Sequence, residues 1–233
     1  MAQNGRWGYI DRNGRVAIEP QFDSAEEFFD GLAVVTVEGN QGCIDSTGRI
    51  VIKPEYQRMS NFSEGLAAVS KGKWGYVDKT GAMVIAPQFG AAGDFSAGLA
   101  TAMVRGQFGY IDKTGQVVVG QLFEDAAVFS EGLAAVKDDG RWGYIDKTGR
   151  VVIKPQFESA AGFSDGLAAV SVGVNRVGYV DTTGRVAIPP TYVSGRRFAR
   201  GLARVTKMAA SGRGTAMSYI DKSGREVWSS AAR

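Results

Sequence analysis

Seven aspartates recur along the chain at almost constant spacing, and their carboxylates are its most regular reactive groups. They are Asp11, Asp45, Asp78, Asp112, Asp146, Asp181 and Asp221. Carboxylates in pairs or clusters serve glycosidases and calcium sites. Each of these aspartates, however, opens an Asp-x-x-Gly sequence, where the carboxylate normally accepts hydrogen bonds from the backbone of its own turn. We therefore expect a structural role for all seven and no metal site.

Other catalytic groups are sparse. Histidine is absent, which removes the commonest general base and metal ligand. The single cysteine, Cys43, replaces a recurrent tyrosine, so we expect a buried spacer and not a nucleophile. Glu64, Glu131 and Asp165 recur just before a Gly-Leu pair and are interpreted as structural. A phosphate-binding G-x-x-x-x-G-K-[ST] sequence does not occur. The sequence predicts no enzyme and no cofactor.

Three tryptophans, Trp7, Trp74 and Trp142, lie 67 and 68 residues apart. Regularly spaced aromatic residues usually belong to the packing between neighbouring units. On that interpretation each indole is partly exposed and packs beneath the next unit. The alternative is a row of stacking platforms for carbohydrate or peptide, which requires the three side chains to be exposed in one line.

Acidic and basic residues are separated along the chain, although the net charge is only +3. Residues 16–48 hold seven acids and no base, and residues 182–220 hold seven bases and no acid. The candidate partner-binding residues are Arg196, Arg197, Arg200, Arg204, Lys207 and Arg213, and the candidate acidic contacts are Glu26, Glu27 and Asp30. These runs are interpreted as solvated faces, as ends that attract each other within a ring or between molecules, or as a site for an external anion.

The basic stretch, residues 185–213, is the best candidate for a contact surface. It includes a small-residue insertion at 208–214, and long loops on a regular scaffold often carry function. Only Tyr192 and Phe198 accompany its bases, so a groove lined with stacking aromatic residues is not indicated. An acidic protein or ligand, or a second copy of the chain, is therefore favoured over nucleic acid.

The elements that position these residues repeat. The turn aspartates follow one another at intervals of 34, 33, 34, 34, 35 and 40 residues, and a period of this size indicates a solenoid, a propeller or another array. We expect one array over residues 1–233, with six units and a C-terminal hairpin cap at about 215–233. An open β-solenoid or superhelical array fits the similar chain ends better, with a closed six- or seven-bladed propeller as the alternative.

Each unit of about 34 residues shows β-signals and no stable helix. In the third hairpin, residues 73–78 alternate large side chains as a strand does, and residues 78–81 form a tight turn. Residues 83–85 return as the partner strand, which Pro87 is expected to end because proline cannot donate to the ladder. A third strand is predicted over residues 98–104, where small alanines favour close packing between units.

The segment between the second and third strands is expected to be a short 3₁₀-like or irregular excursion. Phe89, Ala92 and Phe95 recur there at every third residue, a spacing that suits one tight turn better than a helix. The sequence therefore predicts an all-β tandem repeat with three short strands per unit.

These motifs resemble the WG-repeat, or KWG-repeat, family of mostly bacterial proteins. The full motif, Trp-Gly-Tyr-[Ile/Val]-Asp, stands at residues 7–11, 74–78 and 142–146, and degenerate copies stand at 42–45, 108–112, 177–181 and 218–221. The resemblance covers nearly the whole chain. It implies a β-rich repeat used in binding, often in exported or envelope proteins, and no common catalytic activity.

The expected function is thus a non-catalytic scaffold for protein or ligand binding. Glycan or cell-envelope binding through the tryptophans and a role as an immunity or effector-partner protein are the alternatives. No run of residues is apolar and long enough for a membrane span. The opening residues lack the signal-peptide pattern, so the chain as printed is expected in the cytoplasm, and in the envelope or outside the cell if a leader has been removed.

Overall fold

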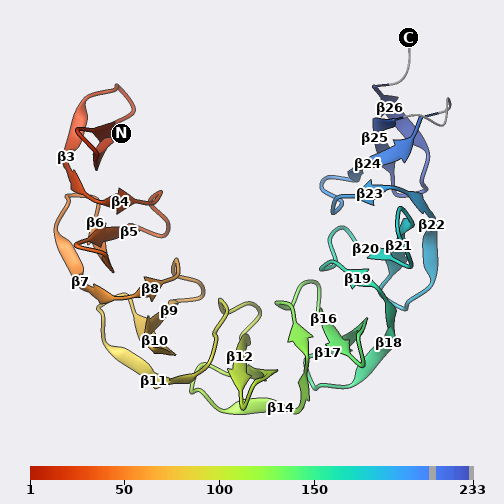
Figure 1. Cartoon of the computed structure of the whole chain (residues 1–233), viewed down its shortest axis with the longest axis horizontal. Helices are drawn as coiled ribbons and strands as arrows, with labels where there is room; N and C mark the ends of the chain where they lie inside the picture. The colour runs from red at the N-terminus through yellow and green to blue at the C-terminus, as the bar shows by residue number, and fades with distance from the viewer. Residues whose placement is uncertain (210–213, 231–233) are drawn as a thin grey trace. The chain divides into compact units, whose positions relative to one another are not determined.

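The computed structural model describes residues 1–209 and 214–230, and every regular element in this part of the chain is a β-strand (Figure 1). The chain forms two compact units, one of Met1–Gly106 with Tyr110–Gln116 and one of Gln107–Gly109 with Val117–Arg233. The expected all-β repeat architecture is confirmed.

The first unit contains three complete sheets, in the orders β1-β2-β3, β4-β5-β6-β7 and β8-β9-β10-β11. Their strands are β1 (Ala2–Gln3), β2 (Arg6–Ile10), β3 (Val16–Phe22), β4 (Ser24–Ala25), β5 (Leu32–Val37), β6 (Asn40–Asp45), β7 (Ile50–Tyr56), β8 (Arg58–Met59), β9 (Leu66–Lys71), β10 (Lys73–Asp78) and β11 (Met83–Phe89). β12 (Ala100–Val104) follows, and the boundary between the units falls within β13 (Gln107–Ile111).

Besides residues 107–109 of β13, the second unit contains β14 (Val117–Phe123) and three complete sheets, β15-β16-β17-β18, β19-β20-β21-β22 and β23-β24-β25-β26. Their strands are β15 (Asp125–Ala126), β16 (Leu133–Asp138), β17 (Arg141–Asp146), β18 (Val151–Phe157), β19 (Ser159–Ala160), β20 (Leu167–Ser171), β21 (Val177–Asp181), β22 (Val186–Tyr192), β23 (Ser194–Gly195), β24 (Leu202–Met208), β25 (Thr215–Asp221) and β26 (Glu226–Ser229). All the sheet pairings described are antiparallel between strands consecutive in the chain.

A short strand that the sequence did not predict is added to the three expected strands of most sheets. β8, for example, pairs with β9 through Arg58↔Ser70 and Met59↔Val69. In residues 89–95, where a 3₁₀-like or irregular excursion is predicted, no 3₁₀ turn forms; after Phe89 the segment is irregular apart from an isolated bridge of Ala92 to Ala102. In most other repeats the first part of the segment pairs with the sheet. The six residues that follow the short strand form what we call a link loop, at residues 26–31, 60–65, 127–132, 161–166 and 196–201.

Pro87 does not end its strand, contrary to the sequence prediction. β11 continues to Phe89, and two residues of β10 span four of β11, because Trp74 lies opposite Phe89 and Tyr76 opposite Ile85. The proline occupies this bulge, where no ladder hydrogen bond is needed from it. A Cβ on Gly75 would lie 2.4 Å from the Ile85 carbonyl oxygen, so the bulge explains the glycine of the Trp-Gly motif.

In the first unit, hydrophobic side chains pack successive sheets against one another. In β9 the side chains of Ala67 and Val69 pack into one hydrophobic cluster with Val34 and Ile52, whereas Leu66 and Ala68 pack into the following cluster. Ala67 and Ala68 are 0% and 1% exposed. The strand is thus buried on both faces, and the expected close packing of its alanines is confirmed.

A buried tyrosine also links successive repeats. The Tyr144 hydroxyl donates to the Ala161 carbonyl oxygen at 2.8 Å, and its ring lies 4.8 Å from that of Phe163. Tyr76 makes the equivalent bond to Gly93 at 2.8 Å. Each bond joins a hairpin to the segment that leads into the next sheet, so the hydroxyl fixes the position of that segment.

Candidate functional site

The turn aspartates hold their own turns together. The Asp78 Oδ1 accepts hydrogen bonds from Thr80 N at 2.8 Å, Thr80 Oγ1 at 2.6 Å and Ala82 N at 3.0 Å. Gly81 closes the turn at a φ of +85°, as the Asp-x-x-Gly pattern predicts. The structural role expected for these aspartates agrees with this geometry.

These hydrogen bonds shift the acidity of the carboxyl groups. The Thr47 hydroxyl, followed by backbone N–H groups and Arg49, lowers the pKa of Asp45 to about 2. The same arrangement lowers the pKa of Asp78, Asp112, Asp146, Asp181 and Asp221. A carboxyl held in its charged form by its own turn is a poor proton donor near neutral pH.

The acids before the Gly-Leu pairs connect link loops. Glu131 Oε2 accepts a hydrogen bond from Gly166 N at 2.9 Å, and Asp165 Oδ2 accepts one from Gly201 N at 2.7 Å. In the first unit Glu64 accepts from Gly98 N at 3.1 Å and pairs with Lys113. Each carboxylate therefore fastens its own repeat to the following one.

Cys43 is fully buried, as predicted for a spacer. Burial, followed by the charge of Glu26, raises the pKa of its thiol to about 12, and Met59 Sδ lies 3.6 Å from its sulfur. Such a thiol carries almost no thiolate at neutral pH. Elsewhere in residues 1–209 and 214–230, no group of three or more Cys, Asp or Glu side chains is arranged to hold a metal ion.

The predicted basic residues gather around the last link loop. Arg196, Arg197 and Arg200 are exposed on residues 196–201, and Arg204 follows on β24, where its carbonyl accepts a hydrogen bond from Arg196 N at 2.8 Å. None of these four arginines forms an ion pair with any described residue. Lys207 differs, because it pairs with Glu226.

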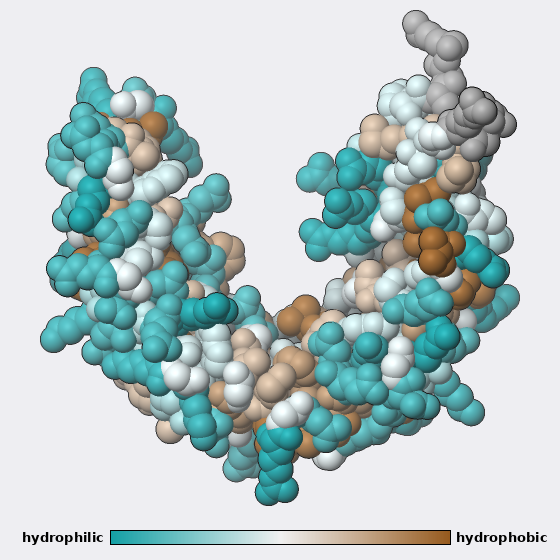
Figure 2. All heavy atoms as spheres, viewed as in Figure 1, coloured by the Kyte–Doolittle hydropathy of each residue, from teal (hydrophilic) through white to brown (hydrophobic). Residues whose placement is uncertain are grey.

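Arg213 and most of the predicted 208–214 insertion lie outside the described residues. The described part of the predicted contact surface contains Arg196, Arg197, Arg200 and Arg204, which we call the arginine patch. Charged and polar side chains cover much of the visible surface of the molecule (Figure 2).

The predicted acidic contacts lie on the first link loop, residues 26–31. Glu26, Glu27 and Asp30 are all exposed there. Asp30 pairs with Lys79 at 2.5 Å, and Glu26 accepts a hydrogen bond from Asn61 at 3.3 Å. Partners within the first unit thus already engage two of the three carboxylates.

The tryptophans differ in exposure. Trp7 is 43% exposed, whereas Trp74 and Trp142 are half-buried and pack against hydrophobic clusters. Where Val177 stands in place of the indole, a cavity of about 240 Å³ opens beside it. The side chain at this position therefore fills space between repeats, as the packing interpretation expects.

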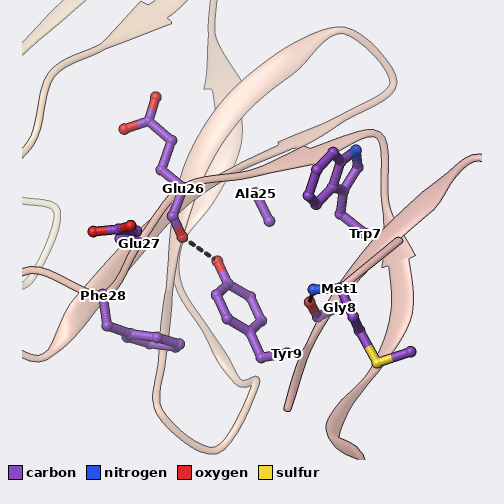
Figure 3. A pocket seen from close by; sticks show the side chains of 8 residues that line it. All are labelled: Met1, Trp7, Gly8, Tyr9, Ala25, Glu26, Glu27 and Phe28. Carbon is purple, nitrogen blue, oxygen red and sulfur yellow. Dashed lines mark hydrogen bonds between the residues drawn. The ribbon is translucent and has the colours of Figure 1, made fainter. Parts of the chain in front are cut away.

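Trp7 borders an aromatic cavity of about 320 Å³ that the sequence did not indicate (Figure 3). Tyr9 and Phe28 line it, with their ring centroids 4.7 Å apart, and the Tyr9 hydroxyl donates to the Glu26 carbonyl oxygen at 2.8 Å. The carboxylates of Glu26 and Glu27 point away from the rings (Figure 3). The cavity is thus lined largely by apolar side chains, and the Met1 ammonium at its edge donates to the Gly8 carbonyl oxygen at 2.8 Å.

A second hollow lies in the second unit and includes one predicted residue, Arg197. It measures about 280 Å³ and is lined by Ala127, Val128, Ser130, Ala161, Gly162, Phe163, Ser164 and Arg197. The charge run located the arginine, but nothing in a single repeat marks the other residues. An alignment of the repeats with one another would have found Gly162, because the equivalent residues are Glu27, Asn61, Asp94, Val128 and Arg197.

The recurring sheets, link loops and turn carboxylates define a β-rich tandem-repeat protein. The chain belongs to the family described as WG containing repeat, whose model matches residues 7–40, 42–73, 74–107, 108–142, 142–173 and 178–207. This membership confirms the resemblance seen in the sequence. No curated protein gives a significant match.

Several solved structures are similar in fold. A eukaryotic initiation factor aligns with a TM-score of 0.59 at 11% identity, over 93% of this chain and 68% of that one. BamB from Moraxella catarrhalis aligns with a TM-score of 0.51 at 13% identity, over 87% and 74%. Hsv2 from Kluyveromyces lactis aligns with a TM-score of 0.52 at 9% identity, over 82% and 70%. At such low identity these similarities concern the fold alone.

No helix in the described residues is long and apolar enough to cross a membrane.

Proposed function

We propose that this chain is a non-catalytic binding scaffold whose contact surface for an acidic protein is the arginine patch. The observation that carries the proposal is the set of four arginines, residues 196–204, that find no acidic partner among the described residues. Unpaired guanidinium groups bind carboxylates through charge-assisted and often bidentate hydrogen bonds. A rigid β-framework presents them without a large loss of conformational entropy on binding.

The absence of catalysis in this proposal is supported by the state of the reactive groups. The turn carboxylates are hydrogen-bonded by their own backbones, and the only thiol is buried with a raised pKa. Glycan binding along the tryptophans receives less support, because Trp74 and Trp142 pack against the hydrophobic clusters. No residue favours an immunity role specifically.

Fluorescence anisotropy with a labelled glutamate-rich peptide tests this function. We expect the chain to bind the peptide at low salt, with binding weakened as salt rises, and the combined variant Arg196→Glu, Arg197→Glu, Arg200→Glu to lose it. The matched control is Lys53→Glu, Arg58→Glu, Lys73→Glu, which makes the same change in charge at exposed residues of the first unit that have no ion pair among the described residues. Equal losses in the two variants would contradict a localised site, and tighter binding of a single-stranded DNA of equal charge would favour nucleic acid instead.

A further inference from the structure

Three successive link loops of the second unit enclose the 280 Å³ hollow, which we call the link-loop groove. Residues 127–130 and 161–164 form its walls, and Arg197 of the next loop lies at its border. Ser130 Oγ donates to the Phe163 carbonyl oxygen at 2.7 Å, and Ser164 Oγ donates to the Phe198 carbonyl oxygen at 2.6 Å. These bonds hold the three loops in register, so the groove is formed before any ligand arrives.

The groove is open because Gly162 has no side chain. A Cβ placed on Gly162 would meet only the Ser130 Cβ, at the ordinary contact distance of 3.5 Å. The preceding loop carries Val128 at the equivalent position, and the following loop carries Arg197. Other link loops thus accommodate larger side chains here, and in this one the space is left free.

The surroundings of the groove are apolar on one side and cationic on the other. Val128 is 46% exposed, and Ala127 and Ala161 lie beside it along the walls. Arg197, with Arg196 and Arg200 on the same loop, is exposed and forms no ion pair with a described residue.

Glu131 and Asp165, the acids of these loops, form no ion pair with the arginines at the border. Glu131 and Asp165 direct a carboxylate oxygen to the backbone N–H groups of Gly166 and Gly201, at 2.9 and 2.7 Å. A carboxylate arriving from another molecule would therefore meet guanidinium groups with no ion-pair partner among the described residues.

We propose that the link-loop groove binds an extended peptide of a partner protein that carries an aliphatic side chain next to carboxylates. The aliphatic group lies over Gly162 between Val128 and Ala161, and a carboxylate reaches Arg197. A volume of about 280 Å³ holds one side chain of this kind and no large cofactor. This inference rests on the proposed function and adds the type of sequence that is recognised.

The test uses the full chain and fluorescein-labelled Gly-Ser-Gly-Leu-Asp-Glu as the probe, followed by fluorescence anisotropy. Two further peptides replace either the leucine by serine or both acids by their amides. We expect each replacement to weaken binding, and Gly162→Leu, which fills the groove, to remove the preference for leucine over serine. Arg197→Gln should weaken binding about tenfold, because one charged hydrogen bond is lost. The control, Arg176→Gln, changes an exposed arginine in the loop between β20 and β21 and should leave binding unchanged.

The outcomes separate this inference from the proposed function. If Gly162→Leu keeps the wild-type preference for leucine, the groove is not the site, whereas binding of the glutamate-rich peptide still judges the arginine patch independently. Wild-type protein that binds the leucine and serine peptides equally also overturns the inference. A circular-dichroism melt establishes that each variant is folded, and Gly162→Ser, a smaller change, should give an intermediate preference if Gly162→Leu does not fold.

Discussion

At the scale of single residues, side-chain hydrogen bonds fasten successive repeats of the second unit to one another. Tyr144 and Tyr179 donate to carbonyl oxygens 17 residues further on, at 2.8 and 2.9 Å. Ser130 and Ser164 make similar bonds between link loops. Repeat proteins derive their stability from contacts between neighbours, so these groups bear on the whole fold although each is local.

The tyrosine hydroxyl can be tested by a change that removes one oxygen. Tyr144→Phe leaves the Ala161 carbonyl without this donor, and we expect a free energy of unfolding lower by about 1 kcal/mol. Tyr219→Phe is the control, because Tyr219 is 37% exposed and its ring makes an edge contact with Trp228 at a centroid distance of 6.0 Å. Urea unfolding followed by circular dichroism measures both, and an equal effect of the two changes would contradict a specific role for the buried hydroxyl.

The turn carboxylates predict how stability depends on pH. Because the folded state lowers the pKa of Asp45 from 3.8 to about 2, its contribution is fully present above about pH 4 and is lost as the pH falls towards 2. The other five lowered turn aspartates act in the same direction. The melting temperature should therefore fall as the pH is lowered from about 4 to about 2, and it should not fall between pH 7 and 5.

A single hydroxyl should control this effect at Asp45. Thr47→Val removes the 2.5 Å bond from Thr47 Oγ1, so we expect the pKa of Asp45 to return towards its ordinary value. Thr191→Val is the control, since Thr191 bonds only to the Pro189 carbonyl. Carboxyl carbon chemical shifts measured against pH follow the titration, and an unchanged pKa in Thr47→Val would count against the hydroxyl.

At the scale of elements, the bulge that contains the proline explains why glycine follows tryptophan in the Trp-Gly motif. A Cβ on Gly143 would lie 2.5 Å from the Ile153 carbonyl oxygen and 2.6 Å from Pro155 N, both of them backbone atoms. The hairpin at Gly109 has no proline partner, and there the closest atom is Leu122 Cδ2 at 2.8 Å, the end of a flexible side chain. The glycine is therefore needed where the bulge brings two backbones together.

These two glycines give a matched pair of substitutions. Gly143→Ala should lower the free energy of unfolding by about 3 kcal/mol, because backbone atoms must move apart. Gly109→Ala should cost about 1 kcal/mol or less, because Leu122 can change rotamer. Urea midpoints compare the two variants, and a larger effect at Gly109 would show that the bulge does not set the requirement.

The sequence predicted the elements that depend on local chemistry. The Asp78 turn, the hairpin strands and the buried alanines of β9 could be inferred because turn geometry and alternation of side chains are local properties. The passage of β11 through Pro87 could not, since it depends on the register against β10. The short strands such as β8 were missed because two residues are too few to show an alternation of side chains.

Of the candidate site, only the charge was predicted from the sequence. Arg196, Arg197 and Arg200 stand out in a run without acids, and charge is visible in one sequence. The groove beside them depends on Gly162 and Val128, which come from two different repeats and meet only when the link loops stack. A hollow formed by the absence of a side chain leaves no positive signal in its own repeat.

At the scale of the whole molecule, the acids and the bases lie in different compact units. Glu26, Glu27 and Asp30 belong to the first unit, and the arginine patch belongs to the second. Exposed ion pairs contribute only about 0.2–1 kcal/mol each, but several together can direct assembly between molecules. Glu27 should contribute most, because Lys79 and Asn61 already engage the other two carboxylates.

We therefore predict self-association through Glu26, Glu27 and Asp30 of one molecule and Arg196, Arg197 and Arg200 of another. Sedimentation velocity should show dimers or larger species at low salt and monomers near 1 M salt. The screening length falls from about 10 Å at 0.1 M salt to about 3 Å at 1 M. Arg196→Glu, Arg197→Glu, Arg200→Glu should be monomeric at both salt concentrations. The complementary variant Glu26→Arg, Glu27→Arg, Asp30→Arg should also be monomeric alone, and mixing the two should restore association because the exchanged charges again match. Two results would contradict contact between these loops: wild-type protein that remains monomeric at low salt, or a mixture of the two variants that fails to associate. The arginine patch would then be free for an acidic partner of another kind.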